Sequence, residues 1–246
     1  MRWRLLAVGI GAYVAALIAM APATLIDAGL QHASEGRLRL AEARGTLWSG
    51  TGRFEIRDAG GRTGLERRLT WRLRAGALLR ARLAYAVALA PNPRPFPVTI
   101  SWSRIELAHA DISLPAAALG LGVPMLAPLE PTGEMQLRIP SLAIGRGGTR
   151  GSATLQWRAA GSALAPVSPL GDYALHVEGE GPVVHATLRT LRGPLQLQGQ
   201  GSWTRDRRPV FLVTAHMPPR FRQQLAPFLR LIAVEQSNGS FELQSR

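Results

Sequence analysis

The chain begins with a long apolar run and then changes to short segments in which apolar and polar residues alternate. Residues 5–26 carry no charged side chain; they follow Arg2 and Arg4 and end before Asp27. At about 1.5 Å per residue, a helix over this run would be roughly 33 Å long, which matches the apolar thickness of a bilayer. The run therefore predicts a transmembrane anchor at residues 5–26, preceded by a short cytoplasmic start at residues 1–4.

A cleaved signal peptide is the alternative interpretation of this run. Its apolar part would be shorter and would be followed by a small-x-small cleavage site. Residues 19–21, Ala-Met-Ala, offer such a site, but Pro22 follows and fits poorly into the extended conformation that a protease requires. We therefore expect the anchor to be retained. Arg2 and Arg4 precede it without an offsetting acid, which predicts a cytoplasmic N-terminus and a periplasmic location, across the inner membrane, for residues 27–246.

Three small residues inside the anchor, Gly11, Ala15 and Ala19, recur at every fourth position. This spacing places them on one face of a helix, where small side chains let a second membrane helix approach closely. Alanine-rich segments also produce the spacing by chance, so a helix-pairing face is one of two interpretations.

The rest of the chain is dominated by apolar residues at every second position, which is the pattern of strands with one buried face. Residues 69–73, Leu-Thr-Trp-Arg-Leu, are one example, and corners containing glycine or proline separate the segments. A longer helical pattern occurs at residues 219–233, where Pro227 should kink or divide the helix. The predicted fold class is mainly β: an amino-terminal transmembrane helix, then a mostly antiparallel sheet or tandem β layers, with one late helix.

A faint internal repeat bears on the domain organisation. Residues 69–73 resemble residues 155–159, Leu-Gln-Trp-Arg-Ala, and less closely residues 201–204. The similarity suggests two related halves, at about residues 35–115 and 130–246, joined by a proline-rich stretch. Strands of equal length also resemble one another by accident, so a single continuous sheet is the alternative.

Two absences in the composition exclude whole classes of chemistry. The chain has no cysteine, and all 29 of its basic side chains are arginine. Without cysteine there are no disulfides, thiolate zinc sites or cysteine nucleophiles. Without lysine there is neither a Walker-type phosphate loop nor Schiff-base chemistry.

The net charge of +13 would favour nucleic-acid binding in a cytosolic protein. A periplasmic location argues against nucleic acid as a partner and favours anionic lipid headgroups or acidic proteins. Six arginines that lie close in sequence form what we term the arginine cluster: Arg67, Arg68, Arg72, Arg74, Arg80 and Arg82. On the exposed side of an edge strand they would discourage aggregation between sheets. Alternatively, they would dock the chain on an acidic partner or on lipid headgroups.

No catalytic, metal-binding or cofactor-binding pattern emerges from the sequence. The five histidines are scattered over different predicted strands, and no pair has the spacing of metal ligands on a helix. His176 and His185 would meet across a hairpin near Glu178 and Glu180, an arrangement typical of a solvated strand face. We therefore expect no enzyme activity, no cofactor and no metal site.

Three segments carry a resemblance to a known family. Residues 43–50 contain Gly-Thr-Leu-Trp-Ser-Gly, residues 168–173 read Ser-Pro-Leu-Gly-Asp-Tyr, and residues 193–203 begin with Gly-Pro-Leu. The motif positions are Gly45, Leu47, Trp48, Gly50, Pro169, Leu170, Gly171, Asp172, Tyr173, Gly193, Pro194, Leu195, Gly199, Gly201 and Trp203. In this order, behind one amino-terminal anchor, they resemble protein N of the bacterial type II secretion system (general secretion pathway protein N). The likeness covers nearly the whole chain.

The resemblance implies an accessory, non-enzymatic inner-membrane component of the secretion machinery, with its bulk in the periplasm. Its implied role is to tether or stabilise the assembly, and its implied partners are other inner-membrane secretion components and the outer-membrane secretin. The motif residues also have structural explanations. Gly45 and Gly50 would permit a tight turn around Trp48, which would cap a β layer. Asp172 would accept hydrogen bonds from turn amides, and Tyr173 would begin the next strand.

A second function is compatible with the same pattern. A curved sheet with an apolar groove would make the protein an envelope lipid-binding or lipid-transfer protein, and Gly-x-Leu-Trp corners also occur in other anchored β proteins of the envelope. A periplasmic enzyme is a third class, but it requires a convergent polar pocket that the sequence does not indicate.

Overall fold

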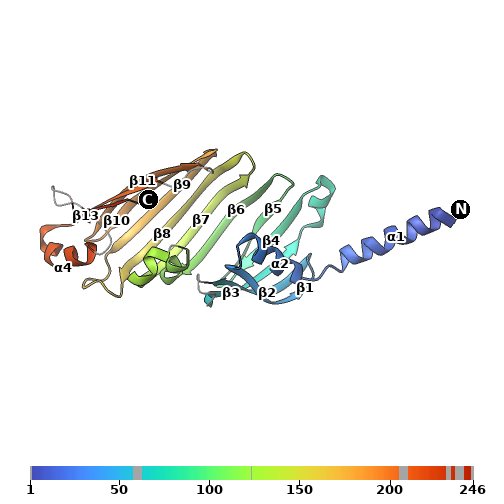
Figure 1. Ribbon diagram of the computed structural model, residues 1–246, viewed down its shortest axis with the longest axis horizontal. Coiled ribbons are helices and arrows are strands. Elements are labelled where there is room, and N and C mark those ends of the chain that lie inside the picture. The colour runs from blue at the N-terminus through green and yellow to red at the C-terminus, as the bar shows by residue number, and fades with distance from the viewer. Residues whose placement is uncertain are drawn as a thin grey trace. The chain divides into compact units, whose positions relative to one another are not determined.

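The computed structural model describes residues 2–57, 63–122, 124–204, 210–230, 234–235 and 241–244. The chain forms two compact units, Met1–Pro95 and Phe96–Arg246, and each has its own apolar core. Within each unit, antiparallel strands pair largely in the order in which they follow one another along the chain (Figure 1).

The first unit is a small antiparallel sheet with a helix packed against it. Its elements are α1 (Arg2–Ala19), α2 (Thr24–Ala33), β1 (Leu38–Gly45), β2 (Ser49–Arg57), β3 (Thr63–Leu73), a 3-10 turn at Ala75–Arg80, and β4 (Leu83–Leu89). Each strand pairs with the next in antiparallel register. Ala23, Leu40, Trp71 and Tyr85 form the core, and side chains of α2 pack against it. α2 therefore lies on the apolar face of this sheet.

The apolar run that predicted one helix over residues 5–26 is divided between two helices. α1 ends at Ala19, and α2 begins at Thr24. Ala23, between them, is buried in the core of the first unit. The last residues of the run therefore pack with the β core instead of continuing α1, which differs from the predicted boundary. None of the helices within the described residues is both long enough and apolar enough to cross a membrane.

β1 lies at the edge of its sheet, and α2 occupies its open side. The amide of Leu38 donates a hydrogen bond to Ser34 Oγ at 2.9 Å, and the amide of Leu40 donates one to Asp27 Oδ1 at 2.8 Å. Gln31 Nε2 donates to the other carboxylate oxygen of Asp27 at 2.7 Å. An added strand would need these same backbone amides, so the side chains of Asp27 in α2 and of Ser34 directly after α2 block strand addition at β1.

The second unit is a larger antiparallel meander with three short helical segments and one longer helix. Its strands are β5 (Asn92–Ile100, which begins in the first unit), β6 (Arg104–Pro115), β7 (Pro131–Gly145), β8 (Gly148–Ser162), β9 (Gly171–Gly181), β10 (Val183–Arg192), β11 (Gln196–Thr204), β12 (Val210–His216), β13 (Val234–Glu235) and β14 (Phe241–Gln244). Its helical segments are 3-10 turns at Ala116–Ala118 and Pro124–Leu129, α3 (Leu119–Gly122) and α4 (Pro219–Leu229). Every strand pair is antiparallel, and β14 inserts between β12 and β13.

The prediction of a mainly antiparallel β fold with one late helix is confirmed. α4 includes Pro227 and ends at Leu229, and residues 231–233 of the predicted helix lie outside the described residues. The proline-rich stretch expected to join two halves lies within the second unit, where Leu114 of β6 pairs with Met135 of β7. The similarity of two halves stays a prediction.

One face of the second sheet is apolar along several neighbouring strands. Val184 lies opposite Trp203, and Leu188 lies opposite Gly199, in the β10–β11 pair. Because side chains alternate along a strand and opposite residues share a face, all four lie on the same side. Buried side chains of α4 contribute to the core cluster on this side: Leu225, Ala226, Phe228 and Leu229.

Candidate functional site

The first motif forms the corner between β1 and β2, and this corner holds the segment that links α1 to α2. The amide of Leu47 donates to the carbonyl of Ala21 at 2.8 Å, and the amide of Ala23 donates to the carbonyl of Gly45 at 3.2 Å. Pro22 forms an isolated antiparallel bridge with Thr46. The corner therefore fixes the position at which the chain leaves α1.

The tryptophan buried at this corner is Trp71 of β3, whereas Trp48 is half-buried. The indole N–H of Trp71 donates to the carbonyl of Thr46 at 3.1 Å. A Cβ added at Gly50 would lie 2.3 Å from the carbonyl oxygen of Arg44 and 2.5 Å from the Trp71 ring. Position 50, the second residue of β2, must therefore be glycine because the Arg44 carbonyl and the ring of Trp71 on β3 occupy the space of a side chain.

The second and third motifs lie side by side, although the sequence separates them. The amide of Leu195 donates to the carbonyl of Leu170 at 3.1 Å, and the hydroxyl of Tyr173 donates to the carbonyl of Leu195 at 3.0 Å. Gly193 has a φ of +130°, and a Cβ there would lie 2.3 Å from the Cα of Gly171. The two glycines thus let the chain segments before β9 and before β11 touch. Burial, followed by the nearby carboxylate, raises the pKa of Tyr173 far above its usual value.

Asp172 accepts a backbone hydrogen bond, as the sequence suggested, but from the neighbouring strand β8. The amide of Ala159 donates to its Oδ1 at 2.7 Å, and the guanidinium of Arg192 donates to its Oδ2. The Ala159 amide, and then Arg192, hold the pKa of the Asp172 carboxyl below its usual value. Asp172 therefore joins three strands and has no substrate-facing geometry.

The remaining motif and candidate residues occupy several places. Pro169 follows a cis peptide bond, Pro194 is half-buried, and Gly199 and Gly201 lie on β11 opposite β12. Gly11 and Ala19 are exposed on α1, and the side chain of Ala15 lies outside the described part of the chain. The helix-pairing face therefore stays a prediction.

The arginine cluster does not guard a sheet edge, because β3 pairs with β2 on one side and β4 on the other. That interpretation is wrong. Arg68 and Arg72 are exposed, while Arg67 is half-buried and alternates with them onto the apolar side of β3. Arg74 and Arg82 are exposed after β3 and before β4, and the side chain of Arg80 lies outside the described residues. A docking role for the exposed arginines stays a prediction.

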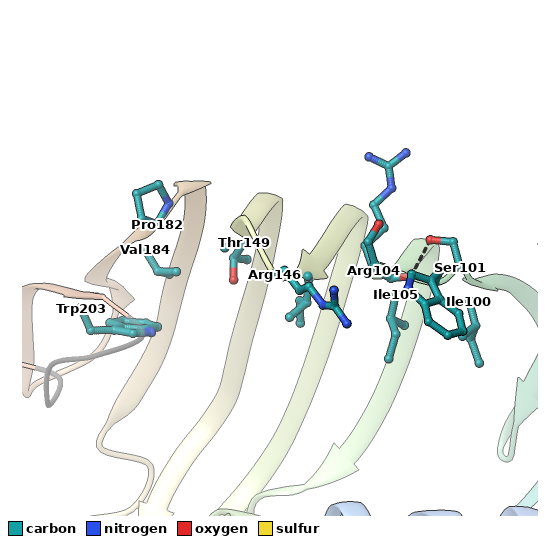
Figure 2. Close-up of a pocket in the computed structure, with 14 residues that line it drawn as sticks. Ile100, Ser101, Arg104, Ile105, Arg146, Thr149, Pro182, Val184 and Trp203 are labelled. Atoms are coloured by element: carbon teal, nitrogen blue, oxygen red, sulfur yellow. Dashed lines mark hydrogen bonds between the residues drawn. The ribbon is translucent and has the colours of Figure 1, made fainter.

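A groove of about 590 Å³ lies at the turn ends of the second sheet, and we term it the turn groove. Ile105 lies opposite Ile144, and Ile144 lies opposite Thr149. Figure 2 shows these strands carrying their side chains along one side of the sheet toward Val184 and Trp203. The lining is: Ile100, Ser101, Trp102, Ser103, Arg104, Ile105, Ile144, Gly145, Arg146, Gly148, Thr149, Pro182, Val184 and Trp203.

The turn groove combines exposed apolar side chains with a cation. Trp102 is 92% exposed, Ile144 49% and Ile105 46%, and Arg146 belongs to the same lining (Figure 2). Arg104 also borders the groove, but its guanidinium points away from it (Figure 2) and pairs with Glu106 at 2.5 Å. The turn is held by a hydrogen bond from Ser101 Oγ to the carbonyl of Arg104 at 2.9 Å. Exposed tryptophan, arginine and aliphatic groups gathered in one place are typical of protein interaction surfaces.

A second cavity, of about 260 Å³, lies beside α4, and we term it the α4 cavity. Its lining is almost entirely apolar: Leu129, Pro131, Trp157, Ala160, Gly161, Ser162, Leu170, Tyr173, Leu188, Leu195, Leu197, Val213, Ala215, Phe228, Leu229 and Phe241. The α4 cavity is partly open to the surface.

Sequence patterns identified only part of these two sites. Trp203 and several α4-cavity residues were recognised as family-motif positions, but the groove residues Trp102, Ile144 and Arg146 were missed. The Ser-Trp-Ser turn at residues 101–103 was the available signal, because a tryptophan between two serines at a strand corner cannot easily be buried. Among the described residues, no group of three or more His, Asp or Glu side chains is placed to hold a metal ion.

Comparison with known proteins gives one match. A family model described as type II secretion system (T2SS), protein N matches residues 36–244, which includes all three motif segments and both cavities. No curated protein and no solved structure matches the chain. Because the family match covers most of its length, the chain belongs to the protein N family of the type II secretion system and is a component of the type II secretion machinery.

Proposed function

We propose that this protein is an accessory, non-enzymatic part of the secretion machinery that holds another component at the periplasmic face of the inner membrane. The turn groove is the observation that carries this proposal. It offers an exposed tryptophan, three isoleucines and Arg146 in one concave surface, and tryptophan and arginine are the residues that most often carry the binding energy of protein interfaces.

The partner of the groove is a protein component of the same machinery that presents apolar side chains beside a carboxylate. The apolar groups would pack on Trp102 and Ile144, and the carboxylate would pair with Arg146. Other inner-membrane secretion components and the outer-membrane secretin are the candidates. Strand addition is a less suitable mechanism at β1, because Asp27 and Ser34 already accept hydrogen bonds from its outward amides.

The amino-terminal apolar run would supply the tether. α1 is apolar on all sides apart from Arg2 and Arg4, and large apolar side chains such as Leu6 and Ile10 are exposed, which is typical of a helix that needs an apolar environment. The two arginines favour a cytoplasmic N-terminus and a periplasmic β region. The hydrogen bonds between the α1–α2 link and the β1–β2 corner would transmit the position of the tether to the first unit.

Photocrosslinking in the native envelope tests the docking proposal. A photoreactive residue replaces Trp102 or Ile144 in the groove, and a matched control replaces Thr187, which is exposed on the opposite face of β10. We expect both groove positions, and not position 187, to capture a secretion component that mass spectrometry identifies. If the groove positions capture none at native expression, or if position 187 captures the same protein, the groove is not the docking surface.

A secretion assay tests the consequence. The double variant Trp102→Ala and Ile144→Ser should reduce secretion of type II substrates by at least about tenfold, because hot-spot truncations cost about 2 kcal/mol or more each. Thr187→Ala is the control. Normal secretion by the double variant at normal protein level would contradict the proposal.

A further inference from the structure

The α4 cavity has no role in the docking function. We propose that it binds one acyl chain of an anionic membrane phospholipid. This inference goes beyond the proposed function, which uses the turn groove at the other ends of the strands that both sites share. It rests on the size of the cavity, on the chemistry of its walls and on the charge of the helix beside it.

The size of the cavity fits the terminal part of one hydrocarbon chain. A methylene group occupies about the same volume as a water molecule in the liquid, roughly 30 Å³. The 260 Å³ of the cavity therefore accommodate roughly eight methylene groups. Ligand pockets are typically concave and mostly apolar, and this partly open, apolar cavity has both properties.

The chemistry of the walls selects hydrocarbon over a peptide or a polar metabolite. Three lining residues carry polar side-chain groups, and a backbone carbonyl already accepts a hydrogen bond from each. Trp157 Nε1 donates to Thr132 at 2.9 Å, Tyr173 Oη donates to Leu195 at 3.0 Å, and Ser162 Oγ donates to Leu129. A peptide inserted here would leave its own amides and carbonyls without partners, which is costly in an apolar site. A saturated chain has no such groups.

The charge of α4 indicates an anionic headgroup. The helix contains Arg220 and Arg222, both exposed, and no acidic residue. The guanidinium carbon of Arg220 lies 4.9 Å from the centre of the Phe221 ring, and Phe221 packs against the same apolar cluster that lines the cavity. A cation is thus held at the margin of the apolar cluster, where a lipid phosphate would lie once its chain is buried.

Native mass spectrometry of the full chain is the first test. The protein is purified in digitonin, whose rigid steroid body cannot enter a space one methylene chain wide. We expect one phospholipid to remain bound to each chain. Ala215→Leu and Ala160→Leu extend side chains into the cavity and should lower the retained lipid by about tenfold or more. Ala186→Leu is the control, because Ala186 is equally buried on the same sheet but does not line the cavity.

A chain-length series on delipidated protein is the second test. Saturated fatty acids from six to fourteen carbons compete with a fluorescent fatty acid, and affinity should rise about fourfold per added methylene. The rise should level off at roughly eight to ten carbons, where the cavity is full. Arg220→Gln should weaken the binding of dioctanoylphosphatidylglycerol about fivefold and leave the binding of 1-decanol unchanged. Arg220→Lys, which keeps the positive charge, should restore the binding of the phospholipid.

The inference is overturned if purified wild-type protein carries no phospholipid and if the affinity for fatty acids does not depend on their chain length. It is also overturned if both filling variants, shown by circular dichroism to be folded, retain lipid like the wild type, or if Ala186→Leu loses as much lipid as they do. None of these results bears on the crosslinks of the turn groove, so the two proposals fail separately.

Discussion

The hydrogen bond between Tyr173 and Leu195 gives a quantitative test of how the two adjacent motifs hold the second unit together. Tyr173 is 4% exposed, and its hydroxyl donates to the Leu195 carbonyl at 3.0 Å. Tyr173→Phe keeps the ring, and with it the edge-to-face contact with Trp157 at a centroid distance of 6.1 Å. It removes only the donor and leaves a buried carbonyl unsatisfied, which costs about 1–3 kcal/mol.

The assay is urea unfolding of the full chain, followed by tryptophan fluorescence, since Trp157 lies beside the substituted ring. The free energy of unfolding should fall by about 2 kcal/mol with no change in the dependence on urea concentration. The melting temperature should fall by about 4–8 °C. Tyr13→Phe is the control, because Tyr13 is exposed on α1, and it should change stability by less than about 0.5 kcal/mol.

The same variant makes a prediction about alkaline pH. Burial, and then the Asp172 carboxylate, raise the pKa of Tyr173, so the folded state keeps the neutral phenol to higher pH than the unfolded state does. The stability that depends on this phenol is fully present below about pH 10 and is lost as the pH rises further. The difference in free energy of unfolding between wild type and Tyr173→Phe should therefore become smaller above about pH 10. Equal stabilities at neutral pH, or an equal loss in Tyr13→Phe, would refute the argument.

Three further outcomes follow from the described contacts. Gly50→Ala places a methyl group 2.3 Å from a backbone oxygen and should lower the melting temperature of the first unit by several degrees. Gly76→Ala is the control, because nothing lies within 4 Å of the added methyl group, and it should leave the melting temperature unchanged. Equal effects of the two substitutions would contradict the steric cause. Asp27→Ala frees the outward amide of Leu40 and should promote concentration-dependent dimers through the β1 edge, which light scattering detects; a strictly monomeric variant would count against the blocking role. Asp172→Asn should lower the free energy of unfolding at neutral pH. Because the pKa of Asp172 is lowered in the folded state, this loss relative to wild type should disappear as the pH falls below about 4. A loss of stability that persists at acidic pH would show that the ionised carboxylate is not its cause.

The alternation of apolar and polar residues was sufficient to predict the strands but not to predict which strands pair with each other. The alternation at residues 69–73 predicts a strand because side chains alternate across a sheet, and β3 contains it. That β3 lies between two strands, so that its arginines do not guard an edge, depends on pairings with β2 and β4. The sequence of one strand contains no information on its neighbours.

The amino-terminal run shows a second kind of failure. Hydropathy cannot distinguish a residue buried in lipid from one buried in protein, so Ala23 counted as part of the anchor although it packs with Leu40 and Trp71. The turn groove shows the reverse. Ile105 and Ile144 have the pattern of core residues, and their exposure results from the lack of a covering element among the described residues, which no local pattern reports.

The hydrogen bonds between the α1–α2 link and the β1–β2 corner determine when a protease could remove the amino-terminal helix. A peptidase that recognises residues 19–21 needs them extended and free. In the folded unit the Ala21 carbonyl accepts the Leu47 amide, and Pro22 is bridged to Thr46. Cleavage must therefore precede closure of the corner, and afterwards it can proceed only as fast as that corner opens by local unfolding. Folding of the first unit itself thus protects the link between the helix and the sheet.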